Sequence, residues 1–106
     1  MTILRNKIIA LLGFAAKSGS LCYGFESTVS AVRAGKAKGV FFASDISAKS
    51  RKEILFHCNR FAVRAFELKD MNIADLSKSK GKKCAVVAVT NNSFCDPIIS
   101  YLTSDV

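Results

Sequence analysis

Hydrophobic residues along this chain recur with two alternating spacings. Segments with the spacing of amphipathic helices lie at roughly 3–17, 26–34, 50–61, 71–78 and 94–102. Apolar runs of strand length lie at 39–43, 62–67 and 83–90, with a shorter candidate strand at 20–23. The first helix has the clearest stripe, formed by Leu4, Ile8, Leu11, Leu12 and Ala15. The alternation predicts one α/β domain over residues 1–106.

Two of the candidate strands are apolar on both faces. Residues 84–89 read Cys-Ala-Val-Val-Ala-Val, and residues 40–43 read Val-Phe-Phe-Ala. Strands of this kind belong to sheets that helices cover on both sides. We therefore predict a three-layer α/β/α sandwich around a small, mixed sheet of about four strands, with residues 84–89 as an interior strand.

Two helix starts are suggested by local signals. Ser50 and Glu53 have the spacing of a capping box, which predicts a helix that begins at Ser50. In the last helix, Asp96 is a candidate N-cap because Pro97 follows it. Alternatively that helix starts at Ser93 and contains Pro97 in its first turn, and the sequence leaves both choices open.

The segment after the first candidate strand has the layout of an anion-binding helix start. Gly24 precedes a short helix with a small, polar opening face, and Lys36 and Lys38 follow that helix. Backbone N–H groups at a helix N-terminus attract anions. Sixteen Lys and Arg residues against eight Asp and Glu give a net charge of +8, so a nucleic-acid phosphate is the first anion to consider.

The basic residues concentrate in three connections. Besides the pair after the second helix, they are Lys49, Arg51 and Lys52, and then Lys78, Lys80, Lys82 and Lys83. A solvated surface explains any single lysine. All the groups together favour a polyanion partner if they gather at one rim of the sheet, and we place Lys69 away from that rim.

No pattern in the sequence indicates catalysis, a metal or a cofactor. The single histidine, His57, is next to Cys58, and neighbours on a helix point about 100° apart, so they make a poor nucleophile–base pair. The cysteines at 22, 58, 84 and 95 form no C-x-x-C motif and lie among apolar residues, which predicts reduced thiols in a cytoplasmic protein. We therefore expect no catalytic residue, no metal and no small-molecule substrate.

The N-terminal segment imitates a signal peptide, because Arg5 and Lys7 precede the apolar run 8–16. Its stripe is that of an amphipathic helix, and the run is too short to span a bilayer. We expect the first helix of the domain here, and no membrane partner.

The order of several short motifs resembles the kink-turn-binding ribosomal protein family (the archaeal "L-seven-Ae" proteins), and most closely its small bacterial YlxQ-like branch. The likeness covers almost the whole chain, and the order and spacing of the motifs carry it. The matching pieces are Leu11 to Gly19, Tyr23-Gly24, Ala31 to Lys38, Ala43 to Ser47, the helix through Lys52 and Cys58-Asn59, and Gly81 to Thr90.

The resemblance implies an α/β/α sandwich that binds sharply bent RNA, ribosomal or otherwise structured. It carries the first RNA-binding loop and helix start over to Gly24, Phe25, Glu26, Ser27, Thr28 and Ser30. It carries two further contact loops over to Ala43, Ser44, Asp45 and Ile46, and to Gly81, Lys82, Lys83 and Cys84. Lys36, Lys82 and Lys83 are expected to supply charge to phosphates.

The first loop departs from the family pattern. Family members that bind kink-turns carry Asn-Glu and then a Lys three residues after that Glu, whereas this chain has Glu26, Ser27 and Ser30. The leading hypothesis is a non-enzymatic RNA-binding protein. The departure favours a second hypothesis, a protein-interaction module that keeps the fold and has lost specific RNA recognition. Phe25 either packs on a splayed base or packs at the helix start.

Overall fold

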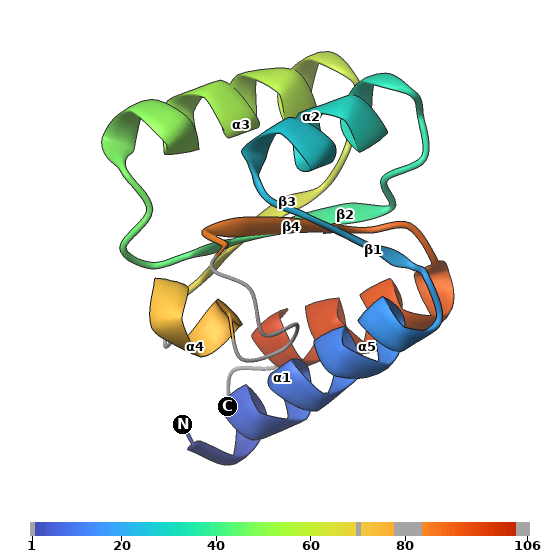
Figure 1. The fold of residues 1–106 in the computed structure, drawn as a ribbon, viewed down its shortest axis with the longest axis vertical. Helices are drawn as coiled ribbons and strands as arrows, with labels where there is room; N and C mark the ends of the chain where they lie inside the picture. The colour runs from blue at the N-terminus through green and yellow to red at the C-terminus, as the bar shows by residue number, and fades with distance from the viewer. Residues whose placement is uncertain (1, 70, 78–83, 104–106) are drawn as a thin grey trace.

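The computed structural model describes residues 2–69, 71–77 and 84–103 (Figure 1). These residues form five helices around a four-stranded sheet of order β1-β4-β2-β3. The strands are β1 (Leu21–Tyr23), β2 (Gly39–Ala43), β3 (Ala65–Leu68) and β4 (Val86–Val89). β4 is antiparallel to both β1 and β2, and β2 is parallel to β3, so the sheet is mixed. The prediction of an interior strand within 84–89 is confirmed.

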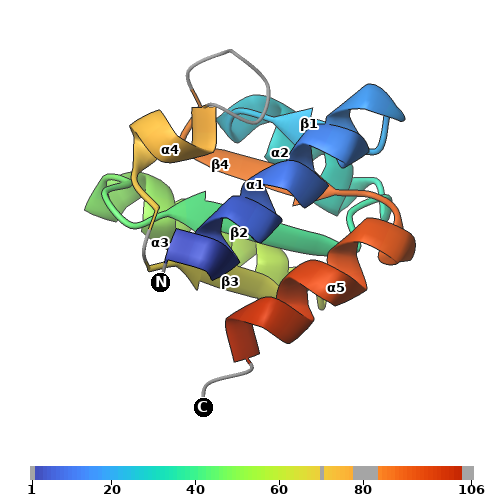
Figure 2. The same cartoon turned by 90° about the horizontal axis from the view of Figure 1, so that it is seen from below.

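Helices cover both faces of the sheet, as predicted. α2 (Phe25–Arg33) and α3 (Ala48–Arg60) lie side by side on one face (Figure 1). α1 (Thr2–Lys17), α4 (Ile73–Ser77) and α5 (Asn92–Thr103) lie on the other, where α1 and α5 pack together (Figure 2). None of the helices that the structure describes has the length and apolar content needed to cross a lipid bilayer.

The alternation of side chains along the strands divides the core in two. Phe41 and Val87 belong to the cluster beneath α1 and α5, whereas Phe42 and Val86 belong to the cluster beneath α2 and α3. All residues of β2 and β4 are buried. This explains why these runs are apolar on both faces, because burial of each large apolar side chain contributes about 1.5–3 kcal/mol.

The capping box predicted at Ser50 is wrong. α3 begins at Ala48, and Ser47 is its N-cap, since the Ser47 Oγ accepts a hydrogen bond of 3.2 Å from the Ser50 backbone N–H. Ser50 is therefore the third residue inside the helix. Ser47 and Ser50 are three residues apart, and either could cap a helix. Because α3 begins about one turn earlier than the capping-box pattern predicts, Ser47 is the cap.

The third strand begins later than predicted. Residues 62–64 form the turn after α3: Ala62 has φ 55°, and the Val63 N–H donates to the Cys58 carbonyl at 2.8 Å. The apolar run at 62–67 therefore includes the turn after α3 as well as most of β3, and apolar character alone does not reveal the boundary between them.

Of the two starts considered for the last helix, the one that leaves Pro97 inside is close to the structure. α5 begins at Asn92, one residue before Ser93, and Pro97 lies within it. The Asn91 side chain accepts from the Ser93 backbone N–H at 2.8 Å, so Asn91 performs the capping that Asp96 was a candidate for.

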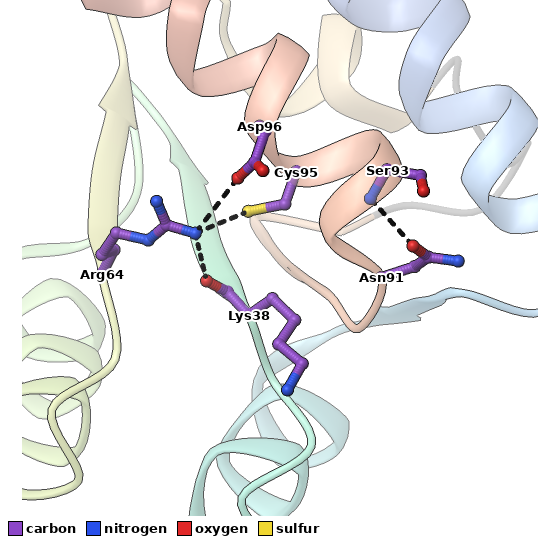
Figure 3. Close-up of polar contacts among 6 residues, drawn as sticks. All are labelled: Lys38, Arg64, Asn91, Ser93, Cys95 and Asp96. Carbon is purple, nitrogen blue, oxygen red and sulfur yellow. Dashed lines mark hydrogen bonds and ion pairs between the residues drawn. The ribbon is translucent and has the colours of Figure 1, made fainter.

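The start of α5 is held against the sheet by one guanidinium group. Arg64 donates to the Lys38 carbonyl at 3.2 Å, contacts the Cys95 Sγ at 3.9 Å and pairs with Asp96 at 3.5 Å (Figure 3). Cys95 is fully buried, and that burial raises the pKa of its thiol, while the charge of Arg64 offsets part of the rise. Gly39 lies against the same sulfur, because a Cβ at this position would overlap the Cys95 Sγ.

The contact between Gly39 and Cys95 generates a stability prediction. Gly39→Ala should lower the free energy of unfolding by about 2 kcal/mol, because the added methyl overpacks a rigid site. In a Cys95→Ala background, which removes the opposing sulfur, the same substitution should cost much less. Urea denaturation of the four proteins of this cycle measures both values, and an equal cost in the two backgrounds would disprove the assigned clash.

The start of α3 generates a second prediction. Ser47→Ala should destabilise the protein by about 1 kcal/mol, because the Ser50 N–H loses its acceptor. Ser50→Ala, the matched control, should change stability by less than about 0.5 kcal/mol. Thermal denaturation followed by circular dichroism compares the two variants. A larger loss of stability for Ser50→Ala would contradict the assignment of Ser47 as the cap.

Candidate functional site

The strand directions bring three connections to one edge of the sheet. Because β1 and β2 are both antiparallel to β4, their C-terminal ends lie beside the start of β4. The Gly24 N–H donates to the Val86 carbonyl at 2.9 Å, and the Ala43 N–H donates to the Ala85 carbonyl at 2.8 Å. We call the surface formed by residues 24–28, 43–47 and 84–85 the loop edge.

The connection from β1 to α2 presents backbone donors at the loop edge. Gly24 is the N-cap of α2 and has φ 95°, a conformation that favours glycine. Its carbonyl accepts from the Thr28 N–H at 3.0 Å. Glycine has no side chain to cap the first helical N–H groups, which therefore point from α2 toward the loop edge.

The side chains of α2 separate into an outer and an inner set. Glu26, Ser27 and Ser30 are exposed, as a binding role requires. Thr28 is fully buried, so its side chain does not belong to the surface, and its hydroxyl makes no hydrogen bond among the described residues. The sequence missed this because a threonine in a polar helix opening carries no signal of burial.

Phe25 is partly buried and packs against the core cluster beneath α2 and α3. Of its two proposed roles, packing at the helix start agrees with this contact. The rest of its ring borders a shallow hollow along the outer side of α2, which is lined by Phe25, Glu26, Val29, Ser30, Arg33 and Ala34.

The connection from β2 to α3 is tied to α4. Asp45 is exposed, but its Oδ1 accepts a hydrogen bond of 2.8 Å from the Ile73 N–H, the first residue of α4. The Ser44 N–H donates to the Met71 carbonyl at 2.8 Å. Ile46 is half-buried against the same core cluster as Phe25. The Asp45 side chain therefore connects the loop after β2 to the start of α4. The Ser44 side chain beside it is exposed.

The start of β4 is buried rather than exposed. Cys84 is 4% exposed, and its N–H donates to the Ser77 Oγ at 3.1 Å. Burial raises the pKa of the Cys84 thiol, and the hydrogen bond with Ser77 partly opposes the rise. The Cys84 side chain therefore belongs to the core. Gly81, Lys82 and Lys83, the rest of this predicted contact loop, lie outside the described residues.

Among the residues that the structure describes, basic side chains near the loop edge come from the start of α3, whereas the predicted Lys82 and Lys83 lie outside the described residues. Lys49 and Lys52 are exposed on the first turns of α3, directly after the loop. Arg51 pairs with Glu67 of β3 at 3.1 Å and lies over the Phe42 ring. The sequence shows that Lys49, Arg51 and Lys52 are grouped. The strand directions add that this group begins at the loop edge.

The positions of Lys36 and Lys69 differ from those expected from the sequence. Lys36 follows the C-terminus of α2, at the opposite edge of the sheet, where the neighbouring Lys38 N–H donates to the Val89 carbonyl. Lys69 directly follows β3, whose last residue pairs with the last residue of β2. Lys69 is therefore on the same side of the sheet as the loop edge, and its expected distant position is wrong.

The described residues provide no grouping of three or more His, Cys, Asp or Glu side chains suited to a metal ion. The cysteines are free thiols, of which Cys22 is partly exposed. Burial raises the pKa of Cys58 to about 11, so this thiol is a poor nucleophile at neutral pH. The loop edge thus presents backbone N–H donors from the start of α2 and positively charged side chains from the start of α3.

Comparison with known proteins gives relatives across most of the chain. Over 90 residues the chain is 33% identical to "RNA-binding protein YlxQ" of Enterococcus faecium, with 85% of each protein covered. Over 85 residues it is 34% identical to "Large ribosomal subunit protein eL30" of Yarrowia lipolytica, which covers 80% of this chain and 77% of the relative.

A solved structure has the same fold. The protein of unknown function from Bacillus halodurans C superimposes with a TM-score of 0.84 at 27% identity, over 91% of this chain and 96% of that one. A family model, "Ribosomal protein L7Ae/L30e/S12e/Gadd45 family", matches residues 6–98. These matches confirm the resemblance inferred from the sequence. The chain belongs to the ribosomal protein L7Ae/L30e/S12e/Gadd45 family.

Proposed function

We propose that this protein binds structured, kink-turn-like RNA at the loop edge, that it does so in the cytoplasm, and that it catalyses no reaction. The observation that carries the proposal is the meeting of the start of α2, the connection after β2 and the start of α3 at one edge of the sheet. A relative of similar length bears the name of an RNA-binding protein, and another that of a ribosomal protein.

Phosphate contacts supply most of the affinity in this proposal. The unpaired N–H groups at the start of α2 suit one phosphate oxygen, as helix N-termini generally do. Lys49 is exposed on the first turn of α3, after the neighbouring loop. Bent RNA brings phosphates from separate parts of the strand close together, and two donor groups at the same edge of the sheet favour such a shape over a straight duplex.

Base contacts come from the exposed side chains of α2. The Glu26 carboxylate is an acceptor for a guanine amino group, and the Ser27 hydroxyl donates or accepts over a shorter reach. Glu26 also repels phosphate, so this surface recognises a base edge at some cost in affinity. Ser30 brings no charge, so the compensating cations come from other segments: the described lysines of α3, and Lys82 and Lys83, which the resemblance selects and which lie outside the described residues.

A protein-interaction role is the competing function, and the same three residues favour it. With Glu26, Ser27 and Ser30 the outer side of α2 carries a hollow with one acid and one base, Glu26 and Arg33. A protein partner would depend on the shape of this hollow and far less on salt than RNA does.

The decisive experiment compares a kink-turn hairpin with a straight duplex of equal length. The unmodified protein should bind the kink-turn hairpin more tightly. The triple change Glu26→Asn, Ser27→Glu and Ser30→Lys should raise that preference by about fivefold or more, because base-edge contacts discriminate between RNAs. Filter binding or fluorescence anisotropy measures both constants. Equal gains for bent and straight RNA would remove α2 from the recognition site and favour the protein-interaction role.

The phosphate contacts are tested by a matched pair of lysines. Lys49→Gln should weaken hairpin binding and lower the log–log salt slope by about one, as for one lost phosphate contact. Lys36→Gln removes an equal charge from the opposite edge, so it should leave the slope nearly unchanged. The two variants carry the same net charge, and an identical effect would mean that the general charge of the protein drives binding.

A further inference from the structure

The outer face of α3 carries a large aromatic side chain that the core does not use. Phe56 is 59% exposed, whereas Ile54 and Cys58 of the same helix are buried against the sheet. Lys52 lies one turn before Phe56 and Arg60 one turn after it, and both are exposed. Lys49 and Asn59 are exposed beside them. Phe56 therefore has a cation one turn away on either side along the helix, and the exposed acid Glu53 also lies within one turn of it.

The neighbouring rings strengthen the aromatic character of this face. The His57 ring meets the Phe56 ring edge-on, with centroids 5.5 Å apart. At the helix end, the Arg60 guanidinium lies 5.9 Å from the centroid of the Phe61 ring, which is 40% exposed. Glu53 is the single acidic residue of α3. We call Lys49, Lys52, Phe56, Asn59 and Arg60 the α3 face.

We propose that the α3 face is a second RNA contact, at which Phe56 stacks on an unpaired base while Lys52 and Arg60 bind the flanking phosphates. The inference rests on the proposed function and extends it to a surface away from the loop edge. Aromatic rings between cations are the usual platform for single-stranded nucleic acid, since every base has a face on which to stack.

Continuity with the loop edge supports this occupant. α3 begins at Ala48, directly after the loop, and runs from there toward the opposite edge of the sheet (Figure 1). At 1.5 Å per residue, Lys52 and Arg60 are about 12 Å apart along the helix. An RNA strand that leaves a bent helix held at the loop edge therefore meets Lys52, Phe56 and Arg60 in that order.

The composition of the α3 face distinguishes RNA from a protein partner. A docking helix buries a broad stripe of aliphatic and aromatic side chains with a polar rim. Here the exposed ring of Phe56 lies between a Lys and an Arg, and the aliphatic Leu55 is 38% exposed on the flank. The cations on both sides of the ring complement phosphates, which favours a nucleotide.

The first test uses Phe56→Leu, which removes the ring from an exposed site without emptying the core. Its matched control is Phe14→Leu on α1, where the phenylalanine is 58% exposed on the opposite side of the sheet. The probes are the kink-turn hairpin with a blunt end and the same hairpin with a short unpaired extension at either end. Phe56→Leu should weaken binding of an extended hairpin by about fivefold or more, while blunt-hairpin binding stays within about twofold. Phe14→Leu should change neither.

The second test reads stacking directly. The chain contains no tryptophan, so Phe56→Trp introduces a single indole on the α3 face. An extended hairpin should quench its fluorescence, and the blunt hairpin should not; Phe14→Trp should respond to neither. Lys52→Gln with Arg60→Gln should lower the salt slope for the extended hairpin by about 1.4, at about 0.7 for each single-strand phosphate contact.

Each outcome decides between the two proposals. If the protein binds the blunt hairpin but gains nothing from an extension, the α3 face is not an RNA contact, and the function proposed for the loop edge stands. If it binds neither hairpin, both proposals fail. Absence of quenching by RNA, with a blue shift of the Phe56→Trp emission on adding an amphipathic peptide rich in glutamate and leucine, would overturn the inference in favour of an acidic protein partner.

Discussion

β4 pairs on both sides with strands that run opposite to it, and the rest of the molecule depends on this pairing. It makes β1 and β2 parallel to each other although they are not neighbours in the sheet. The loops that follow these two strands therefore leave the sheet at the same edge. The hydrogen bonds from Gly24 to Val86 and from Ala43 to Ala85 extend the ladder into the loops themselves. Because the loops are held by backbone bonds, their position is insensitive to the side chains that they present.

The two edges of the sheet have different physical character. At one edge Gly39, Cys95 and Arg64 pack closely, and the polar groups are occupied by contacts within the protein. At the loop edge the helix donors of α2 and the cations of α3 face outward. The closely packed edge and the edge with exposed donors and cations are thus separated by the length of the strands. This separation lets α2 and α3 begin at an exposed surface while their C-terminal ends anchor the fold.

Charge at the loop edge is balanced more finely than the net charge suggests. Asp45 is held by the start of α4, and Arg51 is held by Glu67, so neither is a simple surface charge. Lys49, Lys52 and Glu26 are exposed. Among the described residues, the exposed positive charge near the loop edge therefore comes from α3 more than from α2.

The sequence by itself determined the layers, the buried strands and the family, because apolar periodicity and motif order can be read along the chain without knowing which segments are neighbours. It located Gly24, Glu26, Ser27 and Ser30 on an exposed helix start for the same reason. It did not reveal that Thr28 is buried, since a small polar residue in a polar helix opening gives no signal of burial. For Cys84 it gave two conflicting signals, a buried strand from the apolar run and a contact loop from the resemblance, and the structure agrees with the first. The sequence also did not identify Ser47 as the N-cap of α3, because Ser47 and Ser50 are both residues that can cap a helix. The position at which α3 begins decides between them.

Only the tertiary structure decided which basic residues share a surface. Lys36 precedes β2 and Lys49 follows it, and the direction of β2 between α2 and α3 places the two lysines at opposite edges, so that only Lys49 is near the start of α2. The exposed position of Phe56 likewise follows from the rotation of α3 that buries Ile54 and Cys58. Proximity across a sheet depends on which distant segments pair and in which direction, and the apolar pattern of each strand alone does not name its partner.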